Sequence, residues 1–195
     1  TGKVDYKSLL ASTEYSNYLK LTQQLPYIDL TTLSNSEKKA FFINLYNALA
    51  MHGIALKSSE IGFYRTLRSR LTFFAETSYN IGGSLYSLND IENGILRGNK
   101  PSPVPLSDKP FGDTDPRLAH VLPCDPRIHF ALNCGAASCP PITFYSPDQL
   151  EQQLDLATAN YLQETVRFFL SKRTLFLPQL FRWYLDDFGK DRYLP

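Results

Sequence analysis

Seven of the 13 prolines in this 195-residue chain fall within residues 101–126. Proline lacks a backbone N–H and has a fixed φ, so this stretch forms neither a regular helix nor a central strand. Long irregular loops are functional covers or disordered segments. Because this one leads directly into a segment rich in Cys and His, a cover is one interpretation. We favour a surface crossover wrapped on the core.

Residues 5–56 carry the spacing of amphipathic helices. A first helical segment, ending before Pro26, is predicted by Leu9, Leu10, Tyr15, Tyr18, Leu19 and Leu21. Ser34 and Glu37 form a capping-box pattern that predicts the start of a second helix. That helix covers 37–52, and Gly53 is its expected end, with 54–56 as a strand or a last turn.

Residues 63–100 mix the signals of strand and helix. Leu71–Ala75 is strand-like by composition, and Tyr79–Ser87 predicts a short hairpin with a Gly-Gly turn. Ser87 and Asp90 predict the cap of a short helix over 88–97, which Gly98 ends.

After the proline-rich stretch, Arg127–Leu132 is a strand by composition, and we expect it to be central. A long helix should run from Ser146 or Pro147 to about Phe168. A short strand at 174–177 and a last helix over 180–188 complete the chain. The prediction is one α+β domain over 1–195, richer in helix than in strand, around a small, mainly antiparallel sheet. The helix at 37–52 and the long helix should pack on one face of it, and a papain- or transglutaminase-like arrangement is an analogy drawn from site composition.

Composition excludes several classes of protein. Hydrophobic residues make up 43% of the chain and aromatic residues 13%, enough for a core. The formal net charge of +1 gives no electrostatic signature of nucleic acid binding. No apolar run reaches the roughly 20 residues of a membrane span. The chain is expected to be soluble, and because it begins at Thr1 without Met, a targeting segment could have been removed.

The three cysteines lie within one 16-residue segment, Cys124–Cys139, which also holds His129. Cys134 is the leading candidate nucleophile, because it follows an apolar run and precedes a turn of small residues. Such a turn exposes a side chain and frees backbone N–H groups of Gly135 and Ser138 to hold an oxyanion. The alternative is a buried cysteine packed as a small hydrophobe.

His129 and His52 are the candidate bases for Cys134. If 127–132 were a strand, five residues would separate His129 from Cys134 by about 16 Å, with the two on opposite faces. A base from another element, with His52 the main candidate, is equally plausible. The alternative for His129 is a half-buried residue bonded to a neighbouring backbone group.

Asn44 and Asn47 share one face of the predicted helix. One amide could orient a catalytic histidine, as in Cys-His-Asn sites. The interpretation we favour is that both hydrogen-bond the irregular loop and hold it on the core.

The candidate binding residues are Asn44, Gly135, Ser138, Cys139, Arg127 and Glu92. The spacing of Cys134 and Cys139 fits half of a zinc site, but no matching second pair follows, so we expect no metal and no cofactor. A redox pair has little support because the spacing is not C-x-x-C, and we expect both thiols to be reduced. Arg127, Glu92 and Arg97 are expected members of structural ion pairs.

Five blocks of sequence carry a family resemblance: Val4–Tyr6; Ala40–Leu49 with His52 and Gly53; Ser87–Arg97; Asp125–Pro140; and Trp183, Tyr184 and Asp187–Gly189. With these blocks in this order, the chain resembles the domain of unknown function 547 family along nearly its whole length. Asn93 departs from the pattern, since the family often has histidine there. The resemblance implies a shared fold and no established activity.

Two functional hypotheses follow. One is a cysteine-dependent hydrolase or acyl transferase with a Cys/His/Asn site, acting on an unknown small molecule or peptide. The other is a non-catalytic ligand-binding or protein-interaction module, with a protein partner and a structural polar cluster.

Overall fold

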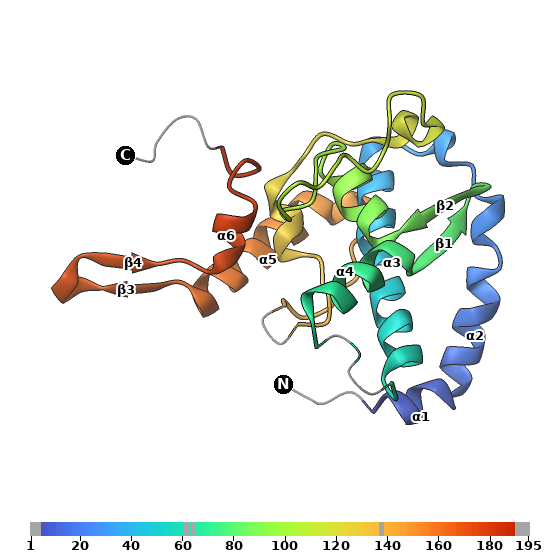
Figure 1. Ribbon diagram of the computed structural model, residues 1–195, viewed down its shortest axis with the longest axis horizontal. Coiled ribbons are helices and arrows are strands. Elements are labelled where there is room, and N and C mark those ends of the chain that lie inside the picture. Colours follow the sequence, from blue (N-terminus) through green and yellow to red (C-terminus); the bar gives the residue numbers. More distant parts are fainter. Residues whose placement is uncertain (1–4, 61–62, 64, 137–138, 190–195) are drawn as a thin grey trace.

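The computed structural model describes residues 5–60, 63, 65–136 and 139–189 (Figure 1). The N-terminal part contains α1 (Tyr6–Leu10) and α2 (Thr13–Thr22), followed by the 3-10 turns η1 (Leu25–Tyr27) and η2 (Leu30–Thr32). The predicted amphipathic segment before Pro26 is therefore confirmed as helical. Both α1 and α2 lie along the outside of the long helix α3 (Figure 1).

The helix α3 (Asn35–Lys57) is the centre of the molecule, and it starts at the predicted capping box. The Ser34 hydroxyl accepts from the Glu37 N–H, while the Glu37 carboxylate accepts from the Ser34 N–H. The expected end at Gly53 is wrong. An added Cβ at Gly53 would lie 2.7 Å from Thr77 and 2.8 Å from Phe73, so this glycine allows close packing inside a continuing helix.

The predicted strand at Leu71–Ala75 is wrong, because these residues lie in α4 (Leu67–Glu76). The Thr66 hydroxyl accepts from the Ser69 N–H and the Ser69 hydroxyl accepts from the Thr66 N–H. This reciprocal cap, together with the packing of Phe73 on α3, outweighs the β propensity of the aromatic residues.

The predicted Gly-Gly hairpin is confirmed as β1 (Ser78–Ile81) and β2 (Ser84–Ser87). Gly82 and Gly83 have φ of +56° and +84°, which glycine adopts without strain. Reciprocal hydrogen bonds between Ser87 and Asp90 then lead into η3 (Asp90–Leu96), a π-helix followed by Gly98 with a φ of +71°.

The proline-rich stretch is a crossover packed on the core, with one short 3-10 helix, η4 (Pro116–His120). Phe111 is buried against Gly94, and Asn99 bonds both the N–H and the carbonyl of Phe111. Further along, the buried Leu122 donates its N–H to the Ile95 carbonyl. These contacts agree with the crossover that we favoured.

The predicted central strand at Arg127–Leu132 is wrong. The chain forms a 3-10 helix, η5 (Pro126–Phe130), because the Asp125 carboxylate caps the Arg127 N–H and Pro126 occupies the first helical position. The helix at 37–52 and the long helix therefore do not flank a sheet containing this segment. Instead, α5 (Leu150–Thr165) packs on η5.

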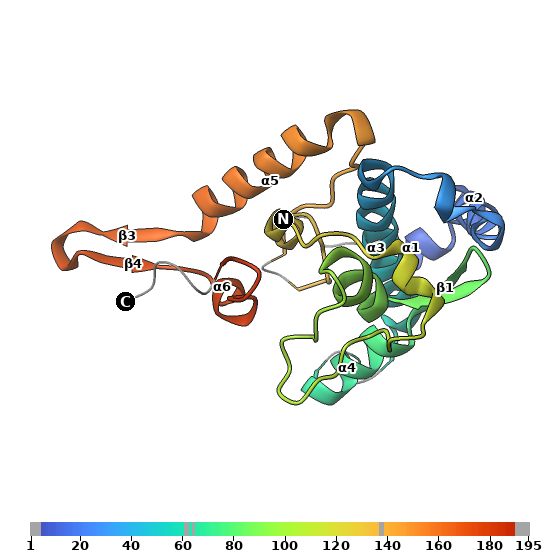
Figure 2. The ribbon, with the colours of Figure 1, turned by 90° about the horizontal axis from the view of Figure 1, so that it is seen from above.

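The C-terminal part begins with η6 (Pro147–Gln149) and α5, which ends at Thr165 and not at Phe168. The strand β3 (Arg167–Phe169), the turn η7 (Leu170–Lys172) and β4 (Thr174–Phe176) form a hairpin that projects from the rest of the molecule (Figures 1 and 2). The last helix is α6 (Gln179–Trp183), shorter than predicted.

The described residues form a helix-rich α+β structure with two small antiparallel sheets of two strands, as the sequence predicts. The core gathers on α3 and η3, with Phe42, Ile43, Leu49, Ile91 and Ile95 almost fully buried. In the described part of the chain, we find no helix with the length and apolar character needed to cross a bilayer.

Candidate functional site

Two asparagines of α3 hold the backbone on either side of the cysteine-containing loop. The Asn47 amide donates to the Ala131 carbonyl at 3.0 Å, and its oxygen accepts from the Asn133 N–H at 2.8 Å. The Asn44 amide donates to the Tyr145 carbonyl at 2.7 Å and accepts from the Tyr145 N–H at 2.9 Å. We expected these side chains to bond the irregular loop at 101–126, but the backbone groups that they bond lie instead at Ala131, Asn133 and Tyr145.

The loop is closed by Asn133, the residue before Cys134. Its side chain donates to the Pro140 carbonyl at 2.7 Å and accepts from the Gly135 N–H at 2.9 Å. Gly135 has a φ of +85°, and an added Cβ would collide with Ile54 of α3. The turn therefore requires glycine, both for its backbone conformation and for its contact with α3.

This turn brings the sulfurs of Cys134 and Cys139 within 3.1 Å of each other. The distance is longer than the roughly 2.05 Å of a disulfide bond. The Cys134 N–H points at the Cys139 sulfur, at 3.3 Å. Both cysteines are half-buried, and Gly135 and Ala136 between them are exposed, so the pair lies at the surface of the loop.

The pKa values of the two thiols are shifted in opposite directions. The hydrogen bond from the Cys134 thiol lowers the pKa of Cys139 despite its burial, and the backbone N–H groups of Cys134, Ala136 and Gly135 add to this effect. The same hydrogen bond to Cys139, together with burial, raises the pKa of Cys134. The arrangement favours a thiolate on Cys139 with the proton kept on Cys134.

Glu92 is held by two phenols, the buried Tyr46 and the half-buried Tyr184. The Tyr46 hydroxyl donates to Glu92 Oε2 at 2.8 Å, and the Tyr184 hydroxyl donates to Oε1 at 2.6 Å. Burial and the nearby Glu92 charge raise the pKa of both tyrosines. The Glu92 charge also contributes to the raised pKa of Cys134, so it disfavours a thiolate there.

His129 is buried in an ion-pair network with Asp187. Its Nε2 lies 2.9 Å from Asp187 Oδ2, and its ring stacks on Tyr184 at 3.9 Å between centroids. Asp187 also accepts from Arg97 at 2.6 Å and from Lys100 at 2.8 Å. Although burial opposes it, these hydrogen bonds hold the pKa of Asp187 below its ordinary value.

Asn93, which departs from the family pattern, supports the same network. Its amide oxygen accepts from Arg97 Nη1 at 2.5 Å, and its amide nitrogen donates to Asn89. Arg97 in turn lies over the ring of Tyr184, 4.6 Å from the centroid. The polar cluster around His129 therefore holds the C-terminal residues 184 and 187 against η3 and η5.

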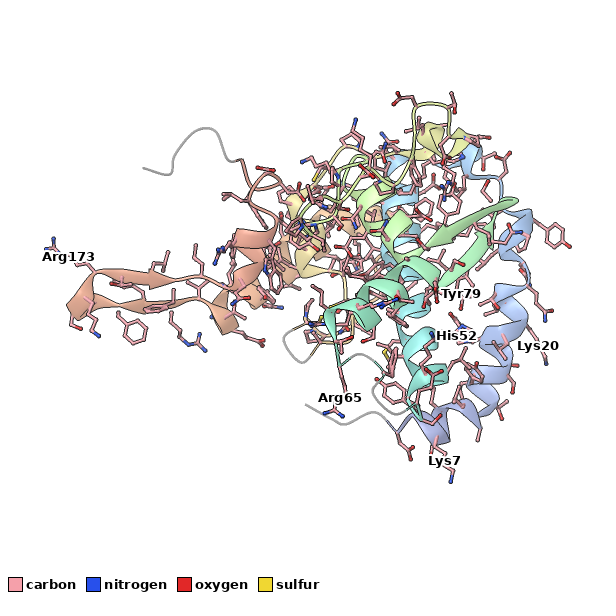
Figure 3. All side chains as sticks on the ribbon, viewed as in Figure 1. Lys7, Lys20, His52, Arg65, Tyr79 and Arg173 are labelled. Atoms are coloured by element: carbon pink, nitrogen blue, oxygen red, sulfur yellow. The ribbon has the colours of Figure 1, made fainter. Side chains whose placement is uncertain are left out.

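His52 lies in a different part of the molecule, between α3, α2 and β1 (Figure 3). Its Nε2 lies 3.0 Å from the Tyr15 hydroxyl, and its Nδ1 lies 2.5 Å from the Tyr79 hydroxyl. Burial lowers the pKa of His52. The structure thus brings His52 to tyrosines, His129 to Asp187, and Cys134 to Cys139.

Arg127 is the centre of an ion-pair network at the surface. It bonds Asp125 at 2.8 Å, Glu151 at 2.5 Å and Asp155 at 2.7 Å, which ties η5 to α5. This agrees with the predicted structural role. Ser138, the remaining candidate binding residue, lies outside the described residues.

Sequence reasoning missed Tyr46, Tyr184 and Asp187 as members of these networks. Asp187 is in one of the blocks that carry the resemblance, but sequence spacing alone could not bring it to His129, 58 residues earlier. Within residues 5–60, 63, 65–136 and 139–189, no cluster of three or more His, Cys, Asp or Glu side chains is suited to a metal ion.

A hollow lies between η2, the β1–β2 hairpin and η4, with a volume of about 230 Å³. Its lining includes Asp29, Thr31, Ser84, Arg117 and His120. Among the described residues, the buried Nδ1 atom of His120 has no hydrogen-bond partner, and burial lowers the pKa of this imidazole. The hollow is lined by both polar and apolar side chains, and none of its lining residues belongs to the cysteine loop.

Comparisons with known proteins support three of the five blocks read from the sequence, those at 40–53, 87–97 and 125–140. The model of the family described as "Protein of unknown function, DUF547" matches residues 30–162, a span that includes α3, η3 and the cysteine loop and ends before the β3–β4 hairpin. Neither the curated proteins nor the solved structures include a match, so the likeness to papain or transglutaminase stays a prediction. Because the matched span covers more than half of its length, the chain belongs to the DUF547 family.

Proposed function

We propose that this protein carries out thiol chemistry at the Cys134–Cys139 pair, with Cys139 as the attacking thiolate and Cys134 as its partner. The observation that carries the proposal is the 3.1 Å approach of the two sulfurs within a loop closed by Asn133. From the sequence alone, Cys134 is the leading candidate nucleophile. The hydrogen-bond pattern supports Cys139 instead, because the Cys134 N–H points at its sulfur.

Two reactions are open to such a thiolate. Hydrolysis or acyl transfer by a Cys/His/Asn site would use His52 or His129 as the acid and base, with Asn47 as the orienting residue. These side chains are bonded to tyrosines, to Asp187 and to the backbone, respectively. Disulfide exchange requires only a second thiol beside the first, and the geometry supports this reaction best.

In the proposed reaction, the Cys139 thiolate attacks one sulfur of a substrate disulfide. A mixed disulfide between Cys139 and the substrate forms, the substrate S–S bond breaks, and the leaving thiolate takes a proton from water. Cys134 then loses its proton to water and attacks the Cys139 sulfur. The second substrate thiolate leaves, the Cys134–Cys139 disulfide forms, and the substrate has gained the two electrons that the protein dithiol has lost.

The test is to trap the mixed disulfide. Reduced protein is mixed with oxidised glutathione, quenched with acid and analysed by intact mass and peptide mapping. We expect the wild type to lose two hydrogens, mapped to Cys134 and Cys139. The Cys134→Ser variant should retain one glutathione on Cys139, whereas Cys124→Ser should behave like the wild type.

Two results would refute the assignment. In one, glutathione accumulates on Cys134 or Cys124 while Cys139 stays reduced. In the other, the wild type forms no Cys134–Cys139 disulfide under conditions that oxidise exposed thiols.

The second candidate is a non-catalytic binding module, which is favoured by the structural use of Asn44 and Asn47. Each amide donates one hydrogen bond to the backbone and accepts one from it, at Tyr145 for Asn44 and at Ala131 and Asn133 for Asn47. Under this alternative, all three cysteines would react slowly with disulfides, and replacing Cys139 would change stability but no reactivity.

A further inference from the structure

The β3–β4 hairpin extends away from the rest of the molecule in two perpendicular views (Figures 1 and 2). Its two strands pair antiparallel, with Arg167 opposite Phe176 and Phe169 opposite Thr174. A two-stranded hairpin without further packing is at best marginally stable in water. This one therefore gains stability from any surface that covers it.

Both faces of the hairpin carry large apolar side chains. The Phe169 and Phe176 rings meet on one face, with centroids 5.2 Å apart, while Phe168 pairs with Leu175 on the other. Six apolar side chains are between 48% and 79% exposed: Phe168, Phe169, Leu170, Leu175, Phe176 and Leu177. Contiguous exposed apolar surface of this kind marks an interaction site.

The charge of the hairpin is opposite to that of the rest of the chain. Residues 167–176 hold three of the 20 Lys and Arg residues and none of the 19 Asp and Glu residues. The remaining 17 basic and 19 acidic residues give the rest of the chain a formal charge of −2. Arg173 lies at the tip of the hairpin and points outward (Figure 3).

We propose that the β3–β4 hairpin is a dimerisation arm, which docks on the body of a second copy of this chain while the second copy's arm docks in return. The basic arm complements the acidic remainder of the chain. When each copy places its arm on the body of the other, both arms are covered. Dimers with two-fold symmetry are the commonest protein oligomers.

The apolar area of the arm is sufficient for a stable dimer. Half-exposed side chains of this size offer on the order of 100 Å² each, or about 300 Å² for the one face of an arm that docks. Two arms and the two surfaces that they cover would remove roughly 1,200 Å² from water, at the lower end of the range of specific interfaces.

A bilayer is a less suitable partner for this hairpin. Insertion end-on would place Lys172 and Arg173 deepest in the hydrocarbon, which is costly for a charge. The acidic remainder of the chain would also be repelled by anionic lipid.

This inference is independent of the thiol chemistry, because it uses none of the cysteine-loop residues. The hairpin also lies beyond residues 30–162 that match the family. Loss of the arm is therefore expected to leave the disulfide exchange at Cys139 intact.

The test is sedimentation velocity of the full chain at micromolar concentration. Wild type should sediment with twice the 22.2 kDa mass of one chain. The Phe169→Asp/Phe176→Asp double variant should be monomeric, as should a variant in which a Gly-Gly linker replaces 167–176. The matched control is Leu106→Asp, an exposed apolar residue of the proline-rich crossover, which should remain dimeric.

Melting curves for each variant show whether the body is folded. A monomeric wild type would overturn the proposal. A wild-type monomer that sediments with vesicles of anionic lipid would also overturn it, in favour of a membrane partner. A dimer that persists in the two-aspartate variant and after removal of the hairpin would overturn it equally.

Discussion

Asn47 accepts a hydrogen bond from the backbone N–H of Asn133 at 2.8 Å and so fixes the residue that precedes Cys134. The other end of the same amide donates to the Ala131 carbonyl at 3.0 Å. One side chain of α3 therefore satisfies two backbone groups of a loop 84 to 86 residues away. The position of the thiol pair depends on this clamp.

We predict that Asn47→Leu destabilises the protein by about 1–3 kcal/mol, because two backbone groups lose their partner in a buried site. Urea denaturation measures the change. The matched control is Asn17→Leu on the exposed side of α2, which should change stability little. Equal stability of the wild type and the Asn47 variant would contradict the clamp.

Gly135→Ala should disrupt the cysteine loop and slow the reaction of Cys139. The new methyl group meets Ile54, and the φ of +85° is itself unfavourable for alanine. Gly83→Ala is the matched control, because its φ is +84° and no atom lies within 4 Å of an added Cβ. We expect Gly135→Ala to be the more destabilising, and equal losses would show that the Ile54 contact does not matter.

Asp187→Asn should destabilise the protein by about 3 kcal/mol or more, because Arg97 and His129 lose a buried ionic partner. The lowered pKa of Asp187 means that its contribution is present above the unfolded pKa of about 3.9 and is lost as the pH falls.

The variant should therefore lose stability less steeply than the wild type below about pH 4. The exposed Asp113→Asn serves as the control for this measurement. Parallel acid-denaturation curves for the wild type and the Asp187 variant would argue against the network.

His52 should make the protein less stable as the pH falls from about 7 to about 5. Burial lowers its pKa below the roughly 6.5 of the unfolded chain, so the unfolded state binds the proton first. The pKa of His120 is also lowered by burial and adds to the decline. His52→Gln should flatten the dependence of the unfolding free energy on pH in this range. An unchanged slope in the variant would contradict the role given to His52.

Local signals in the sequence predicted part of the fold correctly. The capping box at Ser34, the Gly-Gly turn at Gly82 and the end of η3 before Gly98 each depend on residues within a few positions of one another. The same kind of signal explains the errors. At Thr66 and Asp125, a cap outweighed the strand-like composition of the residues that follow.

The site could be predicted only in part. Sequence located the cysteine loop and the two asparagines of α3, because unusual residue types gather there. The advantage of Cys139 over Cys134 depends on the direction of backbone N–H groups, and the partner of His129 is 58 residues away. Neither relationship leaves a pattern in the local spacing.

The most direct test of the thiol assignment is the rate of alkylation of each cysteine by iodoacetamide across pH, read by peptide mass. We predict that Cys139 reacts faster than Cys134 and Cys124 near neutral pH, with an apparent pKa below the roughly 8.5 of an ordinary thiol. Removal of the Cys134 thiol in Cys134→Ser should raise the pKa of Cys139, because the hydrogen bond from this thiol is the main cause of the lowered pKa. Equal, slow labelling of all three cysteines, or fastest labelling of Cys134, would contradict the assignment.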